Sequence, residues 1–91
     1  MWEEVLRRLD RKKACITFDP HVFDRVWYWK LNPSKVEETV RTGYLFKKKC
    51  RFPNILCFTR YFGKENTTYV VIVRYHYYHI EVKTVWPRKG K

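Results

Sequence analysis

The residues best suited to chemistry in this sequence are a histidine and an arginine four positions apart, His21 and Arg25. On an α-helix this spacing places both side chains on one face, where they can act on one ligand. Metal-independent RNA cleavage needs a base for the 2′-hydroxyl, cations for the phosphorus oxygens and an acid for the leaving 5′ oxygen. His21 is a candidate base and Arg25 a candidate phosphate clamp. The alternatives are a histidine that only caps or packs, and an arginine that only pairs with a carboxylate of the fold, such as Glu81.

The segment around this pair has the signals of two helices. Asp19-Pro20 and Asn32-Pro33 each place an N-cap before a proline suited to the first turn, and Gly43 ends the second helix. We therefore expect helices over 21–31 and 34–42. His21 would then lie near a helix N-terminus and beside Arg25, and both positive fields favour a neutral ring that can accept a proton. The helix expected over 21–31 is apolar around most of its circumference, which predicts that it packs against the rest of the protein on more than one side.

The rest of the chain has the two-residue period of strands. We expect strands over 14–18, 44–51, 54–62, 67–78 and 79–86, and an amphipathic helix over 1–13. The predicted fold is α+β: two to three helices on one face of a four- to five-stranded antiparallel sheet, in one domain over 1–91. The final residues, 88–91, are predicted to form a frayed basic tail.

Two arginines on neighbouring strands could complete the site begun by His21 and Arg25. Arg60 and Arg74 each interrupt an apolar face near the end of a predicted strand. Together they could bind a phosphate, although a single cation at such a position often extends to the sheet edge instead. We therefore name His21, Arg25, Arg60 and Arg74 as the candidate catalytic residues.

The charge of the chain favours polyanionic partners. Twenty Lys and Arg against nine Asp and Glu give a formal charge of +11, and 19% of the residues are aromatic. Exposed rings beside cations can stack on the bases of single-stranded RNA, or form a protein interface. The candidate nucleic-acid-binding residues are Lys47, Lys48, Lys49, Arg51, Lys83 and Arg88. The alternatives are an aggregation-blocking lysine-rich edge strand, a salt-bridging face at His79, Glu81 and Lys83, and docking on an acidic protein.

The cysteines and the hydropathy of the chain bear on disulfides, metal binding and membrane insertion. Cys15, Cys50 and Cys57 are odd in number and form no CxxC pair, so we expect neither disulfides nor a zinc site. A reducing cytoplasm fits this pattern. No apolar run approaches the roughly 20 residues that span a bilayer. We expect no cofactor, no metal and no membrane partner.

The segment HVFDRVWYWKLNPSKVEETVRTGYLF resembles the domain of unknown function 4258 family. That family opens with a histidine, an arginine four residues later, and a helix of the form S-x-x-V-E-x-x-x-x-x-G, before its strands. The resemblance runs from about Ile16 to Trp86. The family in turn resembles the RelE and BrnT toxins, which share the wider barnase, EndoU and colicin-type ribonuclease fold. The resemblance implies a RelE-like fold, an RNA target that can be ribosome-associated, and an antitoxin protein as partner.

Three functions follow as expectations. The first is a RelE/BrnT-like toxin that binds RNA and cleaves it without metal. The second is a non-catalytic nucleic-acid-binding or protein-interaction module, and the third is a homodimer formed through exposed aromatic residues. Convergence of His21, Arg25, Arg60 and Arg74 in one basic patch would favour cleavage, whereas dispersal would favour binding alone.

Overall fold

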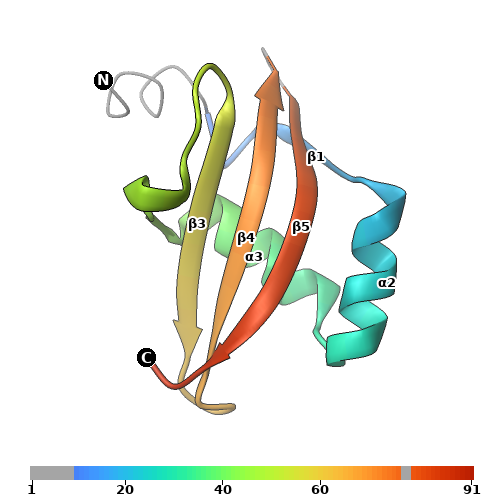
Figure 1. Cartoon of the computed structure of the whole chain (residues 1–91), viewed down its shortest axis with the longest axis vertical. Helices are drawn as coiled ribbons and strands as arrows, with labels where there is room; N and C mark the ends of the chain where they lie inside the picture. Colours follow the sequence, from blue (N-terminus) through green and yellow to red (C-terminus); the bar gives the residue numbers. More distant parts are fainter. Residues whose placement is uncertain (1–9, 77–78) are drawn as a thin grey trace.

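The computed structural model describes residues 10–76 and 79–91, which fold into one sheet and two α-helices (Figure 1). The elements in chain order are β1 (Cys15–Phe18), α2 (Pro20–Trp29), α3 (Pro33–Thr42), β2 (Tyr44–Leu45), the 3₁₀-helix η1 (Lys47–Lys49), β3 (Ile55–Phe62), β4 (Thr67–His76) and β5 (His79–Lys89). The α+β class is thereby confirmed. The helix predicted over 1–13 falls mostly outside the described residues, and the part that is described, 11–13, forms a turn.

The sheet is mixed, so the prediction of a purely antiparallel sheet is wrong. Its strand order is β1-β5-β4-β3-β2, and β1 pairs with β5 in parallel while the other pairs are antiparallel. The two helices carry the chain from β1 to the opposite edge, where β2 begins. Three reversals of direction between β2 and β5 then bring β5 back beside β1 in the same orientation. This pairing joins residues more than 60 positions apart, which local sequence patterns do not encode.

Local capping determines where both helices begin, as predicted. The carboxylate of Asp19 accepts the N–H of His21 at 3.0 Å, and the side chain of Asn32 accepts that of Ser34 at 2.9 Å. Helix α2 ends two residues earlier than predicted because Lys30 adopts the left-handed conformation, with φ 55°. The N–H of Leu31 then donates to Val26 at 2.9 Å, which closes the helix C-terminus.

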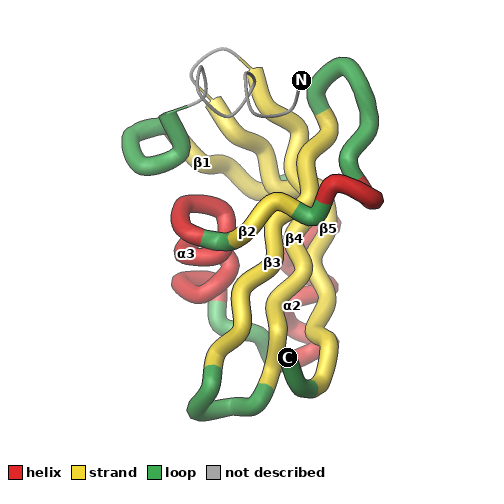
Figure 2. Tube along the Cα trace, turned by 90° about the vertical axis from the view of Figure 1, so that its left-hand side faces the viewer, coloured by secondary structure: helices red, strands yellow, loops and turns green. Residues whose placement is uncertain are grey.

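Both helices pack on one side of the sheet, which we call the inner face. It carries the fully buried side chains of the strands: Leu56, Phe58, Tyr69, Val71, Val73, Ile80, Val82 and Val85. Helix α2 packs on β5, and α3 packs on β3 and β4. In Figure 2 α3 lies on one side of the strands, and the short helix between β2 and β3 lies on the other. The opposite side, on which neither of the two described α-helices packs, is the outer face, with residues such as Tyr44, Thr59, Tyr61, Arg74, Glu81 and Trp86.

Helix α2 buries less of its surface than its composition predicts. Only Val22 and Val26 are buried, whereas the side chains of Phe23, Trp27 and Tyr28 are exposed, Trp27 by 86%. The prediction of packing on more than one side is therefore wrong for the described part of the chain. A surface helix needs only one apolar stripe, and here two valines and the adjoining part of Trp29 provide it.

Two predicted strand segments differ in the structure. Only Tyr44 and Leu45 of segment 44–51 form a strand, and the following lysines form η1. At the other end, β5 continues through Pro87 to Lys89, and the N–H of Gly90 donates to Asn66 at 2.8 Å. The predicted frayed tail is thus wrong up to Gly90. Pro87 is tolerated because β1 pairs only with His79–Val82, so this part of β5 is an edge that needs no donor on that side.

Two arginines hold the C-terminal end of α3 against the segment before β1 through hydrogen bonds to backbone carbonyls. Arg11 donates from Nε to the carbonyl of Val40 at 2.8 Å and from Nη2 to that of Gly43 at 2.6 Å. Its guanidinium also lies 4.1 Å from the centre of the Phe58 ring, and burial lowers its pKa. Arg41 donates to three carbonyls of the segment before β1. The bonds from Arg11 satisfy carbonyls at the end of α3, whereas those from Arg41 fix the segment before β1 to this helix.

The described helices include none that is long and apolar enough to cross a membrane.

Gly43 fills a position where any side chain would collide with backbone. A Cβ built there lies 2.5 Å from the carbonyl oxygen of Thr39 and 2.7 Å from that of Thr59. We expect Gly43→Ala to lower the free energy of unfolding by about 2 kcal/mol, because α3 and β3 must separate. The control is Gly63→Ala, whose Cβ would meet only the Tyr61 ring at 3.7 Å. Urea denaturation of both variants tests this, and equal stabilities would contradict it.

Candidate functional site

The N-cap of α2 holds His21 beside a lysine from the far end of the chain. The carboxylate of Asp19 accepts from Nδ1 of His21 at 2.9 Å and from Nζ of Lys83 at 2.7 Å. Lys83 also lies 3.9 Å from Glu81. Asp19 is shielded, with 16% of its side chain exposed, whereas the His21 side chain is 89% exposed. The fold therefore presents His21 to solvent while a carboxylate holds it in place.

Asp19 stays ionised, and this fixes the proton on the His21 ring. The hydrogen bond from Lys83 and those from His21 hold the pKa of the Asp19 carboxyl far below its usual range. An ionised carboxylate can only accept, so Nδ1 of His21 is the nitrogen that carries hydrogen. In the neutral ring Nε2 then has a free lone pair that can accept a proton. The sequence predicted positive fields around this ring, and the structure adds a negative partner that opposes them.

A second histidine lies on the same edge of the sheet. Nε2 of His79 and Oγ1 of Thr17 are 2.5 Å apart across the parallel β1–β5 pair. The rings of His76 and His79 stack with centroids 5.5 Å apart. This end of the outer face is therefore rich in titratable groups, and the predicted salt bridge between Lys83 and Glu81 is one of its contacts.

The four predicted catalytic residues do not meet. His21 and Arg25 project from α2, and Arg25 is exposed. Arg60 lies on the inner face, where its Nε is 3.2 Å from the carboxylate of Glu38 and its Nη1 donates to Thr42. Arg74 lies on the outer face, opposite Glu81 in the register of β4 and β5. Arg60 thus tethers α3 to β3, and the predicted phosphate site between Arg60 and Arg74 does not form.

The predicted nucleic-acid-binding residues separate into two groups. Lys47, Lys48 and Lys49 are exposed on η1, and Arg51 donates to the carbonyls of Lys48 and Cys50, which shapes the loop. Lys83 is held by Asp19, while Arg88 is exposed on the outer face. Lys48, Lys49 and Arg88 are therefore exposed to a phosphate, whereas Arg51 and Lys83 are already engaged.

The outer face carries aromatic rings in line across the sheet. Register places Tyr44, Thr59, Val70 and Trp86 in one row over four strands. Tyr61 lies in the next row, on the same face and diagonal to Tyr44. Tyr44 is 82% exposed, and Trp86 and Tyr61 are partly exposed. The phenol of Tyr61 donates to Asn66 at 2.8 Å, which fixes that ring.

Cations accompany two of these rings. Nζ of Lys49 lies 5.8 Å from the centre of the Trp86 ring, and Nζ of Lys91 lies 5.9 Å from that of Tyr61. Both distances are within the range of a cation–π contact. We call Tyr44, Tyr61, Trp86, Lys49 and Lys91 the aromatic platform. It brings flat rings and mobile positive charges to one side of the sheet.

Sequence reasoning predicted exposed rings but did not identify the platform. Alternation did place Tyr61 with Thr59 on one strand face, and that signal was sufficient for Tyr61. Tyr44 and Trp86 required the register of non-adjacent strands. Asp19 was identified as a helix cap but not as the partner of His21 and Lys83.

Thiol and metal chemistry find little support in the described residues. All three cysteines are free, and Cys50 and Cys57 are buried. Burial raises the pKa of the Cys57 thiol to about 11, so it stays protonated near neutral pH. Within residues 10–76 and 79–91, no three His, Cys, Asp or Glu side chains cluster in a way that could hold a metal ion.

Comparisons of the chain with protein-family models, with curated proteins and with solved structures found no match.

Asp19 should make the stability of the fold depend on pH. Because its pKa is lowered in the folded state, its stabilising effect is complete above the ordinary Asp value of about 4 and is lost as pH falls toward the folded pKa. Asp19→Asn should therefore be less stable than the parent chain at pH 7, and this difference should shrink at pH 2. Urea denaturation at both values measures it. Asp24→Asn removes an exposed carboxylate from the same helix and should show no such pH-dependent loss.

Proposed function

We propose that this domain binds single-stranded RNA on the outer face of its sheet. The observation that carries the proposal is the aromatic platform, with three rings and two lysines on the side without α-helices. Base stacking on aromatic side chains is worth about 1–3 kcal/mol per base and requires unpaired bases. This geometry therefore favours a single strand over a duplex.

The dimensions of the platform suit a short strand that lies across the sheet. Tyr44 and Trp86 belong to strands that are three places apart in the order β2-β3-β4-β5. At about 4.8 Å per strand their Cα atoms are roughly 14 Å apart, which leaves room for two or three nucleotides between them. Lys48 and Arg88 are exposed beside this path and can contact phosphates.

The dispersal of the four predicted catalytic residues supports binding rather than cleavage as the principal function. Arg60 is engaged with Glu38 on the inner face, while Arg74 is on the outer face. The likeness to RelE and BrnT toxins stays part of the proposal, with a ribosome-associated RNA, an antitoxin and a cytoplasmic location as its corollaries. The order of two helices followed by antiparallel strands supports it.

Loss of the platform rings should weaken RNA binding without a change in charge. We expect Tyr44→Ala and Tyr61→Ala each to lower the affinity for a ten-nucleotide RNA about tenfold, measured by fluorescence anisotropy. Trp27→Ala is the matched control, because Trp27 is as exposed as Tyr44 but lies on α2. Affinity should also fall steeply between 50 and 200 mM salt, since phosphate contacts release counterions. Equal losses in all three variants would contradict the assignment of the site.

Cleavage is the second candidate, and the Asp19–His21 pair is the observation that favours it. Nε2 of His21 can accept the 2′-hydroxyl proton as the 2′ oxygen attacks phosphorus and the 5′ oxygen leaves. Arg25, one helical turn away and exposed, can stabilise the charge on the phosphorus oxygens. His79, bonded to Thr17, is a second imidazole on this edge of the sheet and in its protonated form can donate a proton to the leaving 5′ oxygen.

The cleavage candidate predicts loss of activity in two variants. The purified protein should cut single-stranded RNA in excess chelator, and His21→Ala should slow the reaction at least about 100-fold. Asp19→Asn should also slow it, because the ring loses the partner that fixes its tautomer. Asp24→Asn, which removes an exposed carboxylate of the same helix that lies outside the proposed site, serves as the control. RNA that binds but stays intact would exclude this candidate and leave binding alone.

A further inference from the structure

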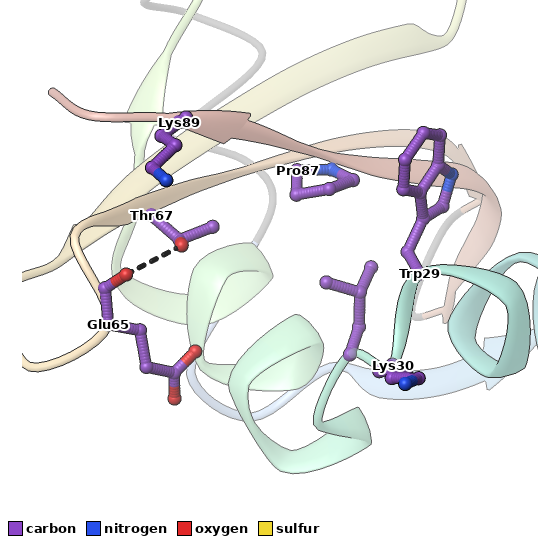
Figure 3. A pocket seen from close by; sticks show the side chains of 7 residues that line it. Trp29, Lys30, Glu65, Thr67, Pro87 and Lys89 are labelled. Atoms are coloured by element: carbon purple, nitrogen blue, oxygen red, sulfur yellow. Dashed lines mark hydrogen bonds between the residues drawn. The ribbon is translucent and has the colours of Figure 1, made fainter.

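A pocket on the inner side of the molecule, at the opposite end of α2 from His21, has no part in the site described above. Its volume is about 480 Å³, and its lining residues are Trp29, Lys30, Leu31, Glu65, Thr67, Pro87 and Lys89. They come from the end of α2, the β3–β4 turn and the end of β5. Figure 3 shows Trp29 and Lys89 at opposite sides of the pocket, with Pro87 between them.

The walls of the pocket are held in place by the fold. The left-handed Lys30 and the hydrogen bond from Leu31 to Val26 fix the end of α2. Oγ1 of Thr67 donates to the carbonyl of Glu65 at 2.9 Å. Gly90 ties the end of β5 to the turn at Asn66. A ligand would therefore find the pocket already formed, which lowers the entropic cost of binding.

The lining combines flat apolar surfaces with positive charge. The Trp29 indole is 44% exposed, and the Tyr28 ring meets it edge-on at 4.8 Å, which restrains its orientation. Pro87 and Leu31 supply further apolar surface. Lys30 and Lys89 are cations, whereas the single carboxylate, Glu65, is paired with Lys35. The excess of charge is positive, so the ligand that fits best has a planar ring and an anionic group.

The pocket and the aromatic platform lie on opposite sides of the end of β5. Alternation places Trp86 and Arg88 on the outer face, and Pro87 and Lys89 on the pocket side. Because β1 pairs with His79–Val82, no strand among residues 10–76 and 79–91 covers the later edge of β5. A polynucleotide on the outer face could pass around this edge and place its last nucleotide in the pocket.

We propose that this pocket binds a nucleotide that carries a phosphate group, either at the end of a bound RNA strand or as a free mononucleotide. The ring stacks on Trp29, and Lys89 contacts the phosphate. The RNA-end form rests on the proposed function, whereas the mononucleotide form does not depend on it.

The first test uses adenosine 5′-monophosphate alone. In NMR spectra, the indole N–H signal of Trp29, assigned with Trp29→Phe, should shift in a saturable way, while adenosine and inorganic phosphate should each bind more weakly. Lys89→Gln should lower the affinity about tenfold, because a hydrogen bond to a charged group is lost. The matched control is Lys64→Gln. Lys64 is an exposed lysine in the turn between β3 and β4, and it does not line the pocket.

The second test separates the two sources. Ten-nucleotide RNAs with a 5′-phosphate, a 3′-phosphate or neither are compared by anisotropy. If the pocket takes an RNA end, one phosphorylated form binds about tenfold tighter and Lys89→Gln removes the preference. Mononucleotide binding without any such preference assigns the pocket to a free nucleotide. The proposal is overturned if the Trp29 signal is unchanged by the mononucleotide and end phosphates have no effect, a result that leaves the Tyr44 test of RNA binding intact.

Discussion

The carboxylate of Asp19 joins the parts of the molecule on which the other features depend. It follows the four-residue strand β1, caps α2, and accepts from Lys83, which lies 64 positions later in the chain. The N–H of Asp19 donates to Val82, so its backbone extends the β1–β5 pairing by one residue. A short parallel edge pair has few ladder bonds of its own, and this residue adds a charged hydrogen bond to them. The direction in which α2 leaves the sheet is set here, and with it the exposure of His21 at one end and the pocket at the other.

In the described part of the chain, α-helices cover one side of the sheet. Two ten-residue helices bury the inner face, while Lys49 of η1 lies over Trp86 on the outer face. The basic residues follow the same division. Arg11, Arg41 and Arg60 bond to α3 and its neighbours, whereas Lys48, Lys49 and Arg88 are exposed around the platform. The formal charge of +11 therefore overstates the charge that a ligand would meet, but Lys48, Lys49 and Arg88 keep part of it beside the exposed rings.

Features with a local cause could be predicted from the sequence, and those with a distant cause could not. The starts of both helices follow from Asp19-Pro20 and Asn32-Pro33, because capping involves residues only two or three positions apart. The parallel β1–β5 pair and the contact of Asp19 with Lys83 depend on how the whole chain returns to its first strand. Segment 44–51 has strand-like residues, yet only Tyr44 and Leu45 find a partner in β3. The two-residue pattern of segment 44–51 indicates a preference for extended backbone, but it does not show whether a neighbouring strand is available for pairing.

Arg60 and Arg74 were predicted to share a phosphate site, and the register between β3 and β4 separates them. Alternation correctly assigned each arginine to a face of its own strand, but the relation between the two strands depends on register. In the structure every even-numbered residue of β3 is opposite an odd-numbered residue of β4, as Arg60 is opposite Tyr69 and Ile55 is opposite Arg74. Even residues of the two strands therefore point to opposite faces. The four-residue turn Gly63–Asn66 sets this parity, and a turn with one residue more or fewer would place the two guanidinium groups on the same side. The same β3–β4 register, together with the β4–β5 register, puts Tyr61 and Trp86 on one face, so the separation of the two arginines and the presence of the aromatic platform depend on a shared constraint.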